Sequence, residues 1–75
     1  MKFNDEIRDY NYRVDISFRN SIMSENKLYM VEFPEFWIAE KYAKAIQDDE
    51  NIKKIYLLER ISDGSFDITR CYKKI

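Results

Sequence analysis

The stretch YNYRVDISFR, residues 10–19, alternates without interruption between apolar or aromatic residues and polar ones. Side chains of a β-strand point alternately to its two faces, so a period of two over this length is typical of a half-buried strand. The face expected toward the core carries Tyr10, Tyr12, Val14, Ile16 and Phe18. The stretch therefore predicts a strand with one buried side, and the segments that follow supply its neighbours.

The next two segments predict a hairpin partner for this strand. Residues 20–26, NSIMSEN, are rich in turn-forming residues and predict a loop. Residues 27–33, KLYMVEF, predict a second strand with Tyr29, Val31 and Phe33 toward the core. The loop is short enough to join the two strands as neighbours, although it is longer than a tight two-residue turn.

Residues 34–50, PEFWIAEKYAKAIQDDE, predict one amphipathic helix. Pro34 suits the first helical position, where its missing N–H is not needed, and Glu35 in the first turn favours the helix dipole. The acidic residues at 48–50 oppose the dipole at the other end, so we expect the helix to fray near Asp48. The apolar stripe, at three- and four-residue spacings, consists of Ile38, Ala39, Tyr42, Ala43, Ala45 and Ile46.

The dipeptide Asp63-Gly64 separates two β-rich segments, 52–61 and 65–73, and predicts a second hairpin with a two-residue type I′ turn. Pairing Ser62 with Ser65 then fixes the register of the two strands. In that register the opposed pairs are Ile61 with Phe66, Arg60 with Asp67, Leu57 with Arg70, and Ile55 with Tyr72. The expected core side is Ile55, Leu57, Ile61, Phe66, Ile68 and Tyr72, and Arg60–Asp67 is expected to be a surface ion pair.

The elements add up to the order β-β-α-β-β in a single small domain, 1–75. We predict an α+β fold, a four-stranded antiparallel sheet with one helix packed on one face. The other face is expected to be open to solvent or to a partner. Residues 1–9 are predicted to be either a flexible arm or a short helical one, with Phe3 and Ile7 four residues apart.

Composition argues against catalysis. The chain has no histidine and only one glycine, so it lacks the commonest general base and any glycine-rich phosphate loop. No neighbour is evident that would activate the lone Cys71, and the acidic clusters at 4–6 and 48–50 lack the spacing of a calcium loop. We expect neither an enzyme nor a protein with a cofactor or a metal site. A lone cysteine, no signal-peptide pattern and no long apolar run favour a cytoplasmic protein.

Trp37 is the residue that the helix pattern does not explain. On a helical wheel it lies nearly opposite the apolar stripe, among Glu40, Lys41 and Lys44. Tryptophan is enriched among the residues that dominate protein interfaces. Two explanations stay open at this point: Trp37 with its charged neighbours binds another protein, or the N-terminal arm or the 20–26 loop covers it.

A second candidate surface is the side of the sheet away from the helix. It is expected to carry the apolar residues Leu28, Met30, Tyr56, Leu58 and Cys71. Monomers seldom expose a large continuous apolar patch, so we expect Met30, Tyr56 and Leu58 to mediate self-association as a homodimer. The other explanation is that the core side of one hairpin is assigned wrongly.

The alternative to protein binding is nucleic-acid binding or a regulatory role. The register of the second hairpin gathers Lys53, Lys54, Lys73 and Lys74 at one end, beside Tyr56. Lysines next to an aromatic residue can bind single-stranded nucleic acid. The formal net charge of −1 does not favour this function, and a lysine-rich rim also protects strand ends from aggregation.

In size, composition and architecture the chain resembles small accessory proteins of phages and mobile elements. The resemblance is to aromatic-rich, slightly acidic β-β-α-β-β proteins that lack catalytic residues, and no motif carries it. Some of those proteins are inhibitors that bind a host defence or regulatory protein. We therefore expect a non-enzymatic binding protein that occupies a protein surface, of the anti-defence or regulatory kind.

Overall fold

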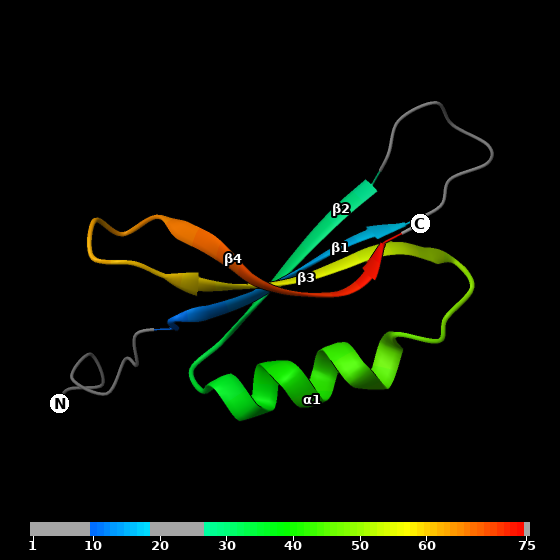
Figure 1. Cartoon of the computed structure of the whole chain (residues 1–75), viewed down its shortest axis with the longest axis horizontal. Coiled ribbons are helices and arrows are strands. Elements are labelled where there is room, and N and C mark those ends of the chain that lie inside the picture. The colour runs from blue at the N-terminus through cyan, green and yellow to red at the C-terminus, as the bar shows by residue number, and fades with distance from the viewer. Residues whose placement is uncertain (1–9, 19–26, 75) are drawn as a thin grey trace, which may run out of the picture.

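The computed structural model of the chain describes residues 10–18 and 27–74 (Figure 1). The predicted loop at 20–26 and the predicted arm at 1–9 lie outside the described residues. The described elements are β1 (Tyr12–Phe18), β2 (Lys27–Phe33), α1 (Phe36–Ile46), β3 (Ile52–Arg60) and β4 (Phe66–Lys74). The predicted order β-β-α-β-β is confirmed.

The four strands form one antiparallel sheet in the order β2-β1-β3-β4, with α1 along one of its faces (Figure 1). The α+β prediction is therefore confirmed. Strand β1, the alternating segment, lies inside the sheet and pairs with both β2 and β3. Its position explains its sequence: one face must be apolar to pack under the helix, and the other can stay polar.

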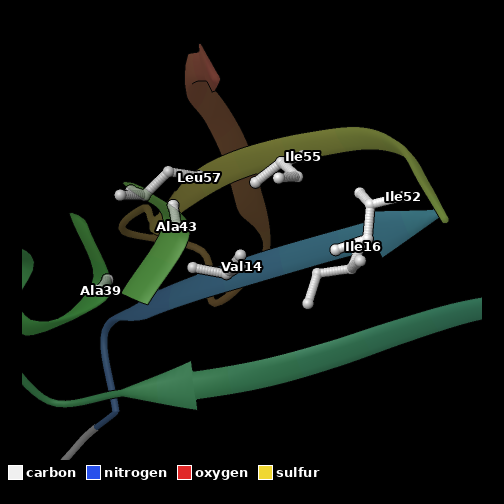
Figure 2. Close-up of a cluster of buried hydrophobic side chains, with 7 residues drawn as sticks. All are labelled: Val14, Ile16, Ala39, Ala43, Ile52, Ile55 and Leu57. Atoms are coloured by element: carbon white, nitrogen blue, oxygen red, sulfur yellow. The ribbon is translucent and has the colours of Figure 1, made fainter. Parts of the chain in front are cut away.

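The core lies between α1 and the two inner strands. Val14 stands between Val31 and Leu57, and Ile16 stands between Tyr29 and Ile55. The helix contributes two fully buried residues, both alanines, which allow its backbone to approach the sheet closely. The buried cluster consists of Val14, Ile16, Ala39, Ala43, Ile52, Ile55 and Leu57 (Figure 2).

The helix is shorter than predicted. Pro34 and Glu35 precede it, so the prediction that Pro34 takes the first helical position is wrong by two residues. Glu35 has an extended backbone (φ −126°, ψ 142°), and its carbonyl accepts the N–H of Ala39 at 3.2 Å. This is the geometry of an N-cap residue, whose carbonyl begins the helical hydrogen bonds while its own backbone stays outside the helix. At the other end the helix stops at Ile46, before the acidic segment.

The turn of the second hairpin is a three-residue loop, so the two-residue type I′ prediction is wrong. The N–H of Gly64 donates to the carbonyl of Ile61 at 2.9 Å, and the N–H of Ile61 donates to the carbonyl of Ser65 at 2.8 Å. Only Gly64 has a positive φ, 93°, among the described residues. This is a type I turn followed by a left-handed glycine, a common hairpin loop. Asp63 Oδ1 accepts hydrogen bonds from the backbone N–H and the hydroxyl of Ser65, which lower the pKa of Asp63.

The extra loop residue shifts the pairing next to the turn by one position. Arg60 pairs with Phe66 and Glu59 with Asp67, so the predicted Arg60–Asp67 ion pair does not form. Instead the Arg60 guanidinium donates to the carbonyls of Gly64 and Tyr10, both at 3.1 Å.

Two β-bulges in β4 then change the register again. Thr69 and Tyr72 are extra residues that face no partner in β3, so the predicted pairing of Leu57 with Arg70 is correct while the pairing of Ile55 with Tyr72 is not. The predicted core side is confirmed for Ile55 and Leu57, which are buried, and Tyr72 packs against the core. It is wrong for Ile61 and Ile68, which are exposed, and for Phe66, which lies on the open face under Arg13 and Arg60.

The turn geometry makes Gly64→Ala destabilising for backbone reasons alone. A Cβ at position 64 meets no atom within 4 Å, whereas the positive φ disfavours any residue with a side chain. We expect Gly64→Ala to lower the free energy of unfolding by about 1 kcal/mol, measured by urea unfolding. Gly64→Asn should cost less, because asparagine tolerates this conformation better. Equal stability of Gly64→Ala and the unaltered chain would contradict the turn.

Candidate binding surfaces

The described residues offer no group of three or more histidine, cysteine or acidic side chains that could hold a metal ion. Cys71 is exposed on β4, in the position opposite Tyr56. No helix in the described part of the chain is long and apolar enough to cross a membrane. The surfaces that remain to be considered are the outer side of α1, the open face of the sheet, and the two sheet edges.

Trp37 is the most exposed large apolar residue among those described, with 63% of its surface accessible. The helix places it there because Ala39, two residues later and about 200° around the axis, faces the sheet. Lys41 and Lys44 follow at the spacings that bring them onto the same side, and both are exposed. The predicted exposed row of Trp37, Lys41 and Lys44 is therefore present on the outer side of α1; we call it the Trp37 row.

Glu40, predicted to belong to the same group, instead ties the helix to the sheet. The hydroxyl of Tyr72 donates to Glu40 Oε2 at 2.8 Å, and Lys44 Nζ lies 3.9 Å from the same oxygen. Tyr72 was expected on the helix side of the sheet, whereas the helical wheel assigned Glu40 to the outer side of α1, so this bond was not predicted. Glu40 therefore borders the Trp37 row but is occupied within the chain.

The contact also changes the titration of Tyr72. Burial is the largest cause, followed by the hydrogen bond to Glu40 and the charge of that carboxylate; together they raise the pKa of Tyr72 to about 12. All three disfavour a tyrosinate.

The open face of the sheet carries the predicted self-association residues, but not as a continuous apolar patch. Met30, Asp15, Tyr56 and Cys71 form one row across the four strands. Asp15 accepts two hydrogen bonds from Arg13, at 2.8 and 3.1 Å, so an ion pair separates Met30 from Tyr56.

Leu58, the third predicted self-association residue, is only 5% exposed. In its row it stands between Arg13 and Ile68. The guanidinium groups of Arg13 and Arg60 each lie 4.6 Å from the centre of the Phe66 ring on this same face. Sequence reasoning missed this cluster because it assigned Phe66 to the core. Met30 is thus the only well-exposed member of the predicted trio.

The predicted lysine cluster is divided between the two faces. Lys54 and Lys74 stand opposite each other on the open face. Lys73 pairs with Ile55 on the helix side, and its Nζ donates to the carbonyl of Asp49 at 2.7 Å. Lys53 is an extra residue where β3 shifts register against β1. Two of the four lysines can therefore act together on the open face.

An exposed stretch along β2 joins Leu28 and Met30, which were expected on the open face, with Tyr29, which was assigned to the core. Leu28, Tyr29 and Met30 are consecutive and about half exposed (54%, 50% and 55%). Tyr29 was predicted to point to the core, and it does lie on the helix side, where its ring packs edge-on to Phe18 at 5.1 Å. It stays exposed because β2 is an edge strand. We call these three residues the β2 edge triplet.

The Tyr72–Glu40 contact predicts how stability depends on pH. The folded state holds the Tyr72 proton more tightly than the unfolded state, since its pKa is about 12 instead of 10.0. This contribution is fully present below pH 10 and is lost as the pH rises from 10 to 12. We expect urea unfolding to show that loss, and Tyr72→Phe to reduce it. Tyr10→Phe, at an exposed tyrosine, is the control and should retain it; the same loss in Tyr72→Phe would contradict the assignment.

Comparison with known proteins gives no family for this chain. No protein-family model matches it, and neither does any curated protein or solved structure. The function is therefore argued from the surfaces described above.

Proposed function

We propose that the chain is a non-enzymatic binding protein that acts through a protein–protein interface, and that the Trp37 row is the centre of that interface. The observation that carries the proposal is the 63% exposure of Trp37 on the side of α1 away from the sheet. The apolar positions of the helix that the fold needs are already supplied by Ala39 and Ala43 and by partly buried residues around them. Trp37 adds little to the core, so a role outside the fold accounts for it best.

The surroundings of Trp37 suggest the chemistry of the partner surface. Lys41 and Lys44 stand beside it on the same side of the helix, and the carboxylate of Glu40 is engaged by Tyr72. A complementary surface would offer an apolar pocket for the indole and carboxylates for the lysines around it. The charges would steer the encounter, while the buried tryptophan would supply most of the affinity.

We further propose that the partner is a host defence or regulatory protein and that binding inhibits it. The support for this narrower statement is the resemblance of the chain to small accessory proteins of phages and mobile elements in size, composition and architecture.

The test uses the whole chain as bait in a lysate of the host cell, together with Trp37→Ala. We expect the unaltered chain to retain a partner that Trp37→Ala loses, because truncating a hot-spot tryptophan costs about 2 kcal/mol or more, or about thirtyfold in affinity. The stability of Trp37→Ala should change by no more than about 0.5 kcal/mol, since the side chain is exposed.

Ile68→Ala is the matched control, because Ile68 is an equally exposed apolar residue on the opposite face of the sheet. It should retain the same partner. A partner that binds Trp37→Ala as well as the unaltered chain would place the interface elsewhere.

Nucleic-acid binding remains the second candidate, favoured by one observation. Lys54 and Lys74 lie directly opposite each other on the open face, where like charges disfavour the fold, and Tyr56 is in the adjacent row. A single-stranded DNA oligonucleotide is the probe. If this candidate is right, binding of the oligonucleotide should weaken steeply with added salt. The double variant Lys54→Ala/Lys74→Ala should bind it more weakly, while Trp37→Ala has no effect. No binding at low salt would exclude it.

A further inference from the structure

The two edges of the sheet differ in how well they are protected. Strand β4 has two bulges, at Thr69 and Tyr72, and carries Asp67, Arg70, Lys73 and Lys74. Bulges and charged residues are the usual means by which an edge strand avoids pairing with another chain. The β4 edge is therefore blocked against strand addition.

Strand β2 has no bulge, and its two charged residues, Lys27 and Glu32, lie toward its ends. All seven of its residues pair with β1 in unbroken register, from Phe33 opposite Tyr12 to Lys27 opposite Phe18. In the described part of the chain its outer side pairs with no strand. The strand contains no proline, and the triplet Leu28–Met30 in its middle is uncharged. An exposed, regular and apolar edge of this kind is a template for another strand.

The exposure of the triplet extends to both faces of the sheet. Leu28 and Met30 lie on the open face, and Tyr29 lies on the helix side. The helix covers the other end of β2, where the ring of Phe33 packs against Tyr42 at 5.2 Å. A partner that packed only on the open face would cover Leu28 and Met30 but leave Tyr29 in water. A strand added alongside β2 would shield all three residues at once.

We propose that β2 pairs antiparallel with β2 of a second copy of this chain, so that one sheet runs through both copies. The strand is self-complementary in this arrangement. A two-fold axis beside Tyr29 sets Leu28 of each copy opposite Met30 of the other, and both helices stay on the same side of the joined sheet. This surface is separate from the Trp37 row, so the two proposals can fail independently.

The experiment is sedimentation equilibrium of the whole chain from micromolar to millimolar concentration, with Tyr29→Lys and Met30→Lys as the test variants. The two-fold axis sets each new lysine near its copy in the other chain, so we expect both variants to weaken self-association by about tenfold or more. Both positions are half exposed, so the variants should fold, which circular dichroism and urea unfolding check. Backbone amides of β2 should also exchange more slowly at concentrations where the copies associate.

Ile68→Lys is the matched control, since it introduces the same charge at an equally exposed apolar position of the other edge strand. It should associate like the unaltered chain, and so should Trp37→Ala. If instead Met30→Lys and Ile68→Lys weaken association while Tyr29→Lys does not, the copies pack through their open faces and the proposal is wrong. A chain that stays monomeric at every concentration also overturns it, including the case in which β2 accepts a strand from a different protein.

Discussion

A single helix can cover only the middle of a four-stranded sheet, and the other features of this structure follow from that limit. Neighbouring strands are about 4.8 Å apart, so the sheet is about 14 Å across, whereas a helix with its side chains is about 10 Å wide. The two buried alanines of α1 hold it close over β1 and β3, where Val14 and Leu57 are fully buried (Figure 2). The core therefore forms over the inner strands, and the helix covers the two outer strands less and to different extents.

The outer strands respond to this limit in opposite ways. Strand β4 bends by means of its bulges, which bring Tyr72 to Glu40 and place the Arg70 guanidinium 5.2 Å from the centre of the Phe36 ring. It gains contacts with the helix and loses a regular outer edge. Strand β2 stays regular, and Phe33 at its end packs against Tyr42 of the helix. As a consequence, the regular edge of β2 leaves apolar side chains in contact with water.

The sequence could predict the elements but not the irregularities between them. Alternation identified β1 and the helix side of the first hairpin, because each residue there faces its partner without insertion. The expected burial is wrong for Tyr10 and Tyr29, which are exposed. Phe66 and Ile68 were misplaced because the extra loop residue shifts their register by one position before either bulge is reached. Each bulge in β4 then reverses which face the following residues present, and no residue type signals where that occurs. Asp63-Gly64 is compatible with both a two- and a three-residue loop, since each has a glycine with positive φ. In the candidate surface, helical spacing alone placed Trp37 outward. The same spacing assigned Glu40 outward as well, although its carboxylate accepts the hydroxyl of Tyr72 on the sheet.

The position of Trp37 also determines what fluorescence spectroscopy can report about this chain. Its indole is nearly as exposed to solvent in the folded state as in an unfolded one, because 63% of its surface is already accessible. Tryptophan emission should therefore change little when the core melts, even though this is the only tryptophan in the chain. The same emission should shift to shorter wavelength when another molecule covers the helix. The fluorescence of Trp37 should therefore report binding at the outer side of α1 and hardly report unfolding of the chain.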